Sequence, residues 1–310
     1  MRKVIGIGET ILDIIFKDGI PAAAVPGGSS FNGIVSLARA GIETCFISET
    51  GCDKVGDTIL DFMKENGIST NYVSRFPDGK SPVSLAFLNT QNEASYFFYK
   101  DYPAQRLVID FPSIEPDDIV LFGAYYSLNP VLRPKIVEFL KYAQAQQALI
   151  YYDPNFRSTH NAESAKLHTS ILENLKYADL VRGAIHDFNN MFGLNSTDDI
   201  YRNKILPQCP NFICTHEGQA ISLYTPVCKK KYPVEQIPTV STIGAGDNFN
   251  AGIIYGLLKY QITKKHFYRL EKELWDKIIR CGIDFAADVC QSYSNSISPA
   301  FVKKLHTQYF

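Results

Sequence analysis

The sequence has no excess of basic residues and no long hydrophobic run. Its 310 residues carry 31 lysines and arginines against 32 aspartates and glutamates, a formal net charge of −1. Nucleic acids and anionic membrane surfaces are usually bound by a positive excess, so this balance argues against both as partners. No stretch approaches the roughly 20 consecutive apolar residues of a membrane-spanning helix. Glu9 interrupts the apolar N-terminal run too early for a secretory signal.

The seven cysteines lack the spacing of a metal site or of a disulfide framework. Their number is odd, they are scattered, and no C-x-x-C pair or histidine-rich stretch accompanies them. Reduced thiols in the cytoplasm are the simplest explanation. Internal repeats and linker-like stretches are also absent, so we expect one α/β domain over residues 1–310. The hydrophobic content of 45% is sufficient for a large core.

A tight glycine loop precedes the most apolar helix expected in the chain. The segment STIGAGDNFN, residues 241–250, opens the run AGIIYGLL, residues 251–258. Two glycines around an alanine allow a sharp turn in which successive N–H groups converge, and the following helix adds the positive end of its dipole. Gly244, Ala245 and Gly246 are therefore predicted to form an anion hole.

Asp247 follows directly after this loop. Its carboxylate could accept the proton of an alcohol that attacks a phosphate held by the loop amides. Phosphoryl transfer suits such a site because its catalysis comes mostly from placement and charge stabilisation. The alternative is purely structural, since aspartate is also a favoured N-cap residue.

The loop resembles the C-terminal signature of the PfkB, or ribokinase-like, family of carbohydrate kinases, in which Asp-Thr-x-Gly-Ala-Gly-Asp carries the anion hole and the catalytic base. Family landmarks follow in order along nearly the whole chain. The resemblance implies a three-layer α/β fold, a mostly parallel sheet with helices on both faces, plus a small β lid from about residues 12–26 and 83–100. It implies ATP and Mg²⁺ as cofactors. Ser241 replaces the signature's leading aspartate, so a monovalent cation such as potassium is doubtful.

Two motifs near the N-terminus resemble the parts of the family that bind the sugar. Asp13 stands in an apolar segment, where a carboxylate costs free energy unless it faces water or finds donors. It is either an outward-facing edge residue or, as in the family, an acceptor for sugar hydroxyls. The motif GGSSFN, residues 27–32, resembles Gly-Gly-x-x-x-Asn, which implies that Gly28 and Asn32 contact the sugar.

Residues 119–123 and 148–152 read as buried parallel strands with a helix between them. The motif DPNFR, residues 153–157, follows the second strand, at the edge where open α/β sheets place ligands. Asn155 and Arg157 could project into that crevice, although such residues also form plain turns. The motif resembles the fructokinase and 2-keto-3-deoxygluconate kinase branch of the family, which favours substrate binding.

The nucleotide motifs match the family less fully. The family's Asn-x-x-Glu, tied to magnesium and phosphate placement, corresponds here to Ala184 and Asp187. Asp187 could still act through water, because Mg²⁺ keeps several waters and needs few protein ligands. Arg182 precedes this motif, and Thr215 and Gly218 retain part of the family's Thr-x-Gly-x-x-Gly. These three residues are therefore expected to bind ATP.

Residues 83–88 and 94–99 read as two strands joined by a polar turn, an antiparallel hairpin. In the family, this region belongs to the β lid, which covers the sugar and is often used for dimerisation. The aromatic cluster Tyr96–Tyr99 is expected to be core or dimer contact rather than direct sugar cover. The basic run Lys229–Lys231 is expected to be a solvated turn between strands.

We therefore expect a cytoplasmic kinase that transfers the γ-phosphate of ATP to a hydroxyl of a monosaccharide, fructose or a related keto sugar. Its partners would be small molecules, with a homodimer through the lid as an option. The alternatives are a ribose, nucleoside or sugar-acid kinase of the same fold, or a non-catalytic sugar-binding or scaffold protein. Ser241, Ala184 and Glu217, which stands where a glycine is usual, favour the non-catalytic alternative.

Overall fold

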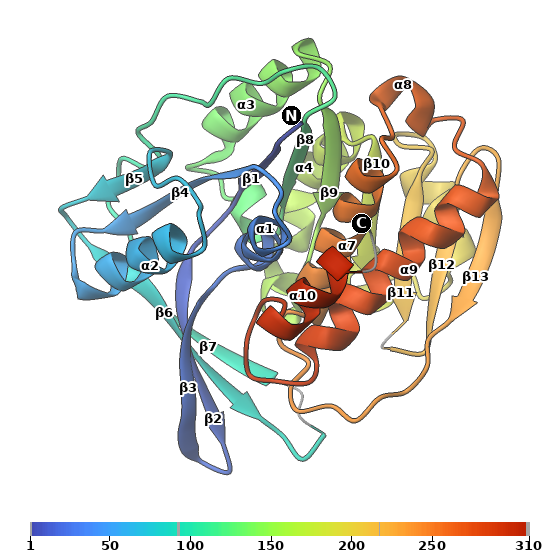
Figure 1. Cartoon of the computed structure of the whole chain (residues 1–310). Coiled ribbons are helices and arrows are strands. Elements are labelled where there is room, and N and C mark those ends of the chain that lie inside the picture. The colour runs from blue at the N-terminus through green and yellow to red at the C-terminus, as the bar shows by residue number, and fades with distance from the viewer. Residues whose placement is uncertain (1, 92–93, 217, 308–310) are drawn as a thin grey trace.

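A nine-stranded sheet runs through the protein, and a four-stranded sheet projects from it (Figure 1). The computed structural model describes residues 2–91, 94–216 and 218–307, so Glu217 lies outside the described residues. The strands of the large sheet, in chain order, are β1 (Val4–Ile7), β4 (Thr44–Gly51), β5 (Val73–Phe76), β8 (Ile119–Gly123), β9 (Leu149–Asp153), β10 (Leu180–Ala184), β11 (Phe212–His216), β12 (Ala220–Tyr224) and β13 (Lys229–Pro233). Their order across the sheet is β13-β12-β11-β10-β9-β8-β1-β4-β5.

The large sheet is parallel from β5 to β11, and the antiparallel strands β12 and β13 close one edge. Strands β1, β8 and β9 are buried along their whole length. This burial explains why they read as continuous hydrophobic runs rather than as alternating patterns. The predicted unit of two parallel strands with a helix between them is confirmed in β8, α3 and β9.

Helices cover both faces of the large sheet (Figure 1). One hydrophobic core packs α1, α2, α7, α9 and α10 against the sheet, and a second core packs α3, α4 and α5 against the opposite face. The helices are α1 (Ser29–Arg39), α2 (Lys54–Glu65), α3 (Arg133–Ala145), α4 (Ser164–Tyr177), α5 (Ile185–Phe192), α6 (Thr197–Ile200), α7 (Ala245–Lys259), α8 (Lys264–Phe267), α9 (Lys272–Val289) and α10 (Pro299–Thr307). The predicted three-layer α/β fold is confirmed. No helix of the described ranges is long and apolar enough to cross a membrane.

Helix α7 is buried on almost every side, as its apolar sequence predicts. It packs closely on α9, because a Cβ atom on Gly252 would lie 2.3 Å from the carbonyl oxygen of Cys281. The chain enters α7 through Gly244, whose φ of 78° is left-handed and favours glycine. This packing fixes the start of α7 against the sheet.

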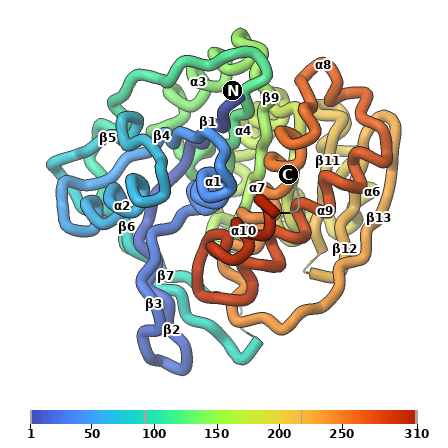
Figure 2. Tube along the Cα trace, viewed as in Figure 1, coloured from blue at the N-terminus to red at the C-terminus, as the bar shows by residue number. Residues whose placement is uncertain are grey.

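The smaller sheet joins two hairpins that lie far apart in the sequence. Its strands are β2 (Ile11–Lys17), β3 (Ile20–Gly27), β6 (Lys80–Leu88) and β7 (Ala94–Asp101), in the order β3-β2-β6-β7. The pairing of β6 with β7 is antiparallel, which confirms the predicted hairpin, whereas β2 and β6 pair in parallel. In Figure 2, this sheet projects from the lower side of the main body of the protein.

The prediction of a turn at Lys229–Lys231 is wrong, because these residues begin the edge strand β13. Lys229 pairs with Asp198, and Lys230 pairs with Asp276 of α9. Lysine is tolerated there because an edge strand leaves one side of its backbone and many side chains in solvent. The run is therefore part of a sheet edge.

Candidate active site

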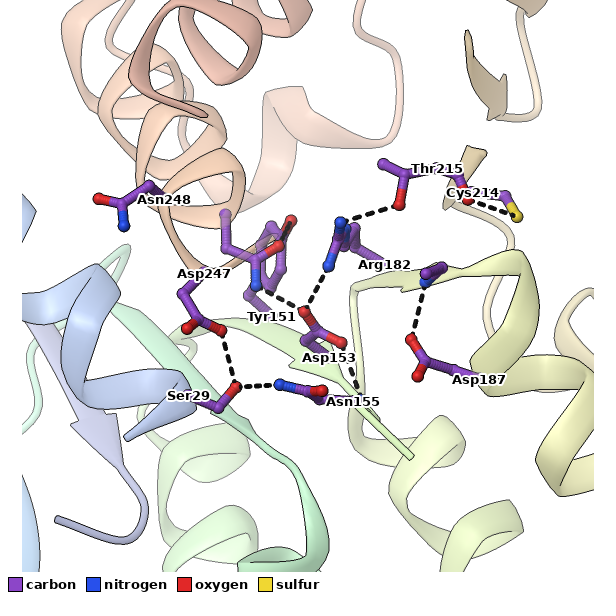
Figure 3. Close-up of polar contacts among 12 residues, drawn as sticks. Ser29, Tyr151, Asp153, Asn155, Arg182, Asp187, Cys214, Thr215, Asp247 and Asn248 are labelled. Atoms are coloured by element: carbon purple, nitrogen blue, oxygen red, sulfur yellow. Dashed lines mark hydrogen bonds and ion pairs between the residues drawn. The ribbon is translucent and has the colours of Figure 1, made fainter. Parts of the chain in front are cut away.

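The glycine loop before α7 lies at the carboxyl ends of β9 and β10 and beside the start of α1 (Figure 3). Gly244 occupies the N-cap position of α7, and no side chain caps this helix. Asp247 lies in the first turn of α7, beyond the cap. The structural alternative for Asp247, an N-cap role, is therefore wrong, and its carboxylate is free for other contacts.

Asp247 is buried and held on both carboxylate oxygens. Ser29 Oγ donates to Asp247 Oδ1 at 3.0 Å, and Asn32 Nδ2 donates to Oδ2 at 2.8 Å. Burial raises the pKa of Asp247 to about 6; the negative charge of Asp153 acts in the same direction, against the hydrogen bond from Asn32. A carboxylate with a pKa just below neutrality is suited to general-base catalysis at physiological pH.

A buried network connects the end of β9 with α7 and β11. Arg182 Nη1 donates to Asp153 Oδ2 at 2.9 Å, and Arg182 Nη2 donates to Thr215 Oγ1 at 2.8 Å (Figure 3). Asn250 Nδ2 donates to the same Asp153 oxygen at 2.6 Å, and the Tyr151 hydroxyl donates to Asn250 Oδ1. Further hydrogen bonds, from Asn250 to Asp153 and from Arg182 to Thr215, support this buried ion pair.

Arg182 also places a positive charge directly behind the glycine loop. A Cβ atom on Gly246 would lie 3.1 Å from Arg182 Nη1, so the missing side chain of Gly246 lets the two approach. Arg182 Nε is buried and makes no hydrogen bond to the residues that the structure describes. The loop amides, the N-terminus of α7 and this guanidinium together favour a bound anion.

Asp187 lies just after the end of β10, in the first turn of α5. Its Oδ2 accepts from the backbone N–H of Ala184 at 2.8 Å, at the first turn of α5. Its Oδ1 is buried without a hydrogen bond to the described residues, and His186 Nε2 lies 3.4 Å away. Burial, reinforced by the charge of Asp153, raises the pKa of Asp187 to about 6. Within the described ranges, no group of three or more His, Cys, Asp or Glu side chains forms a metal cluster.

Asp13 lies in the interior of the smaller sheet, in β2 between β3 and β6. The alternative of an outward-facing edge residue is wrong, because only 5% of Asp13 is exposed. Ser84 Oγ donates to Asp13 Oδ1, and Asn295 Nδ2 donates to Oδ2 at 3.1 Å. Burial raises the pKa of Asp13 to about 6. Asn295 also links Asp13 to α7, because Asn248 Nδ2 donates to its carbonyl oxygen.

Gly28 and Asn32 lie at the start of α1. Gly28 is the N-cap of α1, and a Cβ atom there would lie 2.1 Å from the carbonyl oxygen of Glu9, so only glycine fits. Asn32 is buried, and its side-chain amide points to Asp247. The structure therefore connects Asn32 to the candidate base.

Asn155 and Arg157 follow β9 as the sequence predicts. Asn155 has a φ of 35°, which is uncommon for a residue with a side chain, and its Nδ2 donates to Ser29 Oγ at 2.7 Å. Arg157 is exposed as a residue, but its guanidinium faces the site and lies 5.1 Å from the centre of the Tyr96 ring of β7. Arg157 thus connects the β9 turn with the smaller sheet.

Of the predicted nucleotide residues, Arg182 and Thr215 are in contact, and Gly218 lies in the turn between β11 and β12 with a φ of 72°. The sequence analysis missed Ser29, Asn250 and Asn295. Ser29 lies inside the GGSSFN motif, and Asn250 follows Asp247 by one helical turn. The neighbouring motif residues could therefore have indicated that both lie near the site. Asn295 has none, because it contacts Asp13 across 282 residues.

A second buried ion pair, between Glu49 and Arg106, was also missed. Glu49 is the third residue from the end of β4, and its side chain is 1% exposed against 6% for Arg106. Glu49 Oε1 accepts from the guanidinium, and Oε2 accepts from the backbone N–H of Leu107 at 2.9 Å. Arg106 lies over the ring of Tyr102, 3.5 Å from its centre, and Tyr102 donates to Glu9.

Comparison with known proteins agrees with this site. Residues 1–300 match the model of the pfkB family of carbohydrate kinases. The chain is 27% identical over 275 residues to a fructokinase of Rhizobium leguminosarum, covering 86% of this chain and 83% of that protein. It is 26% identical over 248 residues to a 5-dehydro-2-deoxygluconokinase of Clostridium perfringens, covering 75% of this chain and 72% of that protein.

The fold is shared with a fructokinase of Vibrio cholerae whose crystal structure contains fructose, ADP and a calcium ion. The TM-score is 0.85 at 17% identity, over 98% of this chain and 99% of that one. The family match spans the glycine loop, Asp247 and both halves of the sheet. The chain therefore belongs to the pfkB family of carbohydrate kinases, enzymes that transfer a phosphoryl group to a sugar.

Proposed function

We propose that the protein transfers the γ-phosphate of ATP to a hydroxyl group of a keto sugar, with fructose as the first candidate. The observation that carries the proposal is Asp247, a buried carboxylate with a pKa of about 6, beside an anion-binding loop. The fructokinases among the relatives support fructose. The 5-dehydro-2-deoxygluconokinase keeps a sugar acid as the alternative acceptor.

In this reaction, Asp247 accepts the proton of the attacking sugar hydroxyl, whose oxygen bonds to the γ-phosphorus while the bond to the ADP oxygen breaks. The backbone N–H groups of Gly244 and Gly246 hold the transferring phosphoryl group, whereas the predicted contribution of Ala245 is weakened, because its N–H donates to the carbonyl oxygen of Thr242 at 3.2 Å. Arg182 stabilises its charge from behind the loop, and Thr215 and Asp153 fix the guanidinium. Such preorganised positive groups are the main source of catalysis in phosphoryl transfer.

Mg²⁺ fits the phosphate side of this site. Asp187 Oδ1 is a buried acceptor without a hydrogen bond in the described chain, and it could hold a water of the hydrated ion. When bound, the ion would neutralise negative charge on the phosphates. A monovalent cation does not fit at Ser241, which is 1% exposed and whose hydroxyl accepts from the Ile243 N–H at 3.1 Å.

The sugar would lie between the glycine loop and the smaller sheet, which would act as a lid. Asp13 would accept hydrogen bonds from sugar hydroxyls, and Asn155 and Arg157 would contact the sugar from the β9 turn. Gly28 lets the chain approach this space, and Asn32 would serve the sugar and Asp247 together. Gly218 would lie at the nucleotide end, beyond Thr215.

The test is ADP release from ATP and Mg²⁺ with fructose, 2-keto-3-deoxygluconate, ribose, tagatose and adenosine as acceptors. We expect release with fructose or tagatose to exceed that with the sugar acid at least tenfold in kcat/KM. If kcat/KM is largest for ribose, adenosine or the sugar acid, that compound would be the substrate instead of fructose. Absence of ATP binding by calorimetry would instead support the non-catalytic alternative.

We also propose that the smaller sheet forms a homodimer through its outer face. Phe87, Phe97 and Tyr99 are 37%, 58% and 61% exposed, and the strand register places them on one face of the sheet. Phe87 stacks on Phe16, and Phe97 packs edge-on against Phe87, so the aromatic side chains form an apolar patch on this face. Large exposed apolar patches usually mark interaction sites.

Phe97→Glu is expected to convert a dimer into a monomer, because the interface would have to bury an unpaired carboxylate. Sedimentation velocity at micromolar concentration measures this change. Val131→Glu is the matched control, since Val131 is 59% exposed and lies in the turn before α3 on the main body. A monomeric wild-type protein, or equal dissociation of both variants, would contradict the proposed interface.

The cytoplasm is the proposed location. All seven cysteines lie within the described ranges and are free thiols. Free thiols are typical of a reducing compartment. Fractionation of the native cells, followed by detection with an antibody, checks this location.

A further inference from the structure

We propose that Ser29 is a positioning residue that orients Asp247 for proton abstraction and joins it to the Asp153–Arg182 network. This inference rests on the proposed function in one respect, the role of Asp247 as base. It goes beyond that function because it assigns a role to the hydroxyl of Ser29, a residue of the GGSSFN motif at the start of α1.

The hydroxyl of Ser29 bridges two groups of the site (Figure 3). It donates to Asp247 Oδ1 at 3.0 Å and accepts from Asn155 Nδ2 at 2.7 Å. Because a hydroxyl has a single proton, the direction of the chain is fixed from Asn155 through Ser29 to Asp247. A hydroxyl that accepts one hydrogen bond becomes a stronger donor in the next, so the chain favours a carboxylate at its end.

Ser29 and Asn32 together fix the plane of the carboxylate. They lie one turn apart in α1, and each donates to a different oxygen of Asp247. With Asn32 alone, the carboxylate could rotate about its Cβ–Cγ bond. Each oxygen retains a lone pair for the incoming sugar hydroxyl, so the two donors orient the base without blocking it.

Asn155 extends the chain to the phosphate side. Its backbone N–H donates to Asp153 Oδ1 at 3.0 Å, while Asp153 Oδ2 accepts from Arg182 and Asn250. The positive φ of Asn155 directs its side chain away from this contact and toward Ser29. One continuous set of hydrogen bonds therefore runs from the base to the guanidinium behind the glycine loop.

The pH dependence of the reaction reports on this contact. Asp247 faces the charge of Asp153 from β9, which raises its pKa, and that of Arg157 from the following turn, which lowers it. Tyr96 of β7 is a further titratable group whose charge interacts with that of Asp247, and the Arg182 guanidinium lies beside the preceding Gly246. The hydrogen bond from Ser29 stabilises the ionised form, so its removal raises the pKa of Asp247.

The experiment compares Ser29→Ala, Ser29→Thr and Ser30→Ala, with kcat/KM for the sugar measured from pH 5 to 8. We expect Ser29→Ala to lower kcat by about 10- to 100-fold, the loss of one hydrogen bond to a charged group. The acid limb should move to higher pH by about one pH unit, while KM for ATP stays within about twofold. Ser29→Thr keeps the hydroxyl and should restore both values. Ser30, buried in the same helical turn, is the matched control.

Asn155→Gly provides a second variant, since glycine adopts the positive φ while losing the amide. In the double variant Ser29→Ala/Asn155→Gly, the acid limb should lie at the same pH as in Ser29→Ala alone, because the chain to Asp247 is already broken. A further shift of the acid limb in the double variant would overturn the inference. So would an unchanged acid limb in Ser29→Ala, or an equal shift in Ser30→Ala.

A readout without turnover separates the two proposals. The carboxyl ¹³C resonance of Asp247, identified by its absence in Asp247→Asn, reports the pKa of Asp247 directly. A higher midpoint in Ser29→Ala supports the contact even if no sugar is phosphorylated, in which case the kinase assignment fails and the contact stands. An unchanged midpoint overturns the inference whatever the activity.

Discussion

Asp247→Asn is expected to lower kcat by roughly 10²- to 10⁴-fold, the usual contribution of a general base. The amide has nearly the shape of the carboxylate and cannot accept the proton of the sugar hydroxyl. In the wild type, kcat/KM should fall as the pH drops below about 6, because the pKa of Asp247 is raised to about 6 and only the ionised form is a base. Steady-state kinetics of the wild type and the variant over this pH range measure both effects.

Two control measurements test whether the loss of activity in Asp247→Asn comes from the missing base rather than from weaker binding or lower stability. Calorimetric binding of the sugar and ATP should change by no more than a few-fold, because Asp13, Arg157 and the loop amides are untouched. The melting temperature should change little, since the variant removes a buried charge, and its amide oxygen can still accept from one of the two donors, Ser29 or Asn32. A kcat within a few-fold of the wild type would refute the assignment of the base.

Arg106→Leu is expected to lower the free energy of unfolding by about 3–5 kcal/mol, the usual cost of an unpaired buried charge. The variant leaves the Glu49 carboxylate, 1% exposed, without its cation. The backbone N–H of Leu107 remains as a donor but supplies no full charge. Urea denaturation measures the change.

Lys100→Leu is the matched control, because Lys100 pairs with Glu9 where both side chains reach solvent, at 32% and 23% exposure. We expect it to cost less than about 1 kcal/mol. The double variant Glu49→Leu/Arg106→Leu should recover much of the stability, since both charges are then absent. Equal losses in Arg106→Leu and Lys100→Leu would show that burial does not decide the strength of these pairs.

Local patterns explain why the glycine loop, the β8–β9 unit and the β6–β7 hairpin could be predicted from the sequence. In each case the signal lies within a few residues, as a turn, a hydrophobic period or a motif spacing. The prediction of a turn at Lys229–Lys231 was wrong for a related reason. Its charge favours a turn, but an edge strand accepts the same side chains.

Contacts between distant segments could not be predicted. Asp13 and Asn295 are 282 residues apart, and Ser29 and Asp247 are 218 apart, so no local pattern links them. The pKa values are equally non-local, because the burial that raises those of Asp13 and Asp247 comes from the whole fold. The sequence therefore predicts which residues carry the chemistry better than it predicts what holds them in place.

The contact between Asp13 and Asn295 has a consequence for the order in which the protein assembles during synthesis. The ribosome makes β2 early, yet the side chain that completes the surroundings of Asp13 is translated only after α9. The hairpins β2–β3 and β6–β7 can pair while translation continues, since both lie within the first 101 residues. The proposed sugar site is finished last, so a truncated nascent chain can form a sheet before the side-chain contacts around Asp13 are complete.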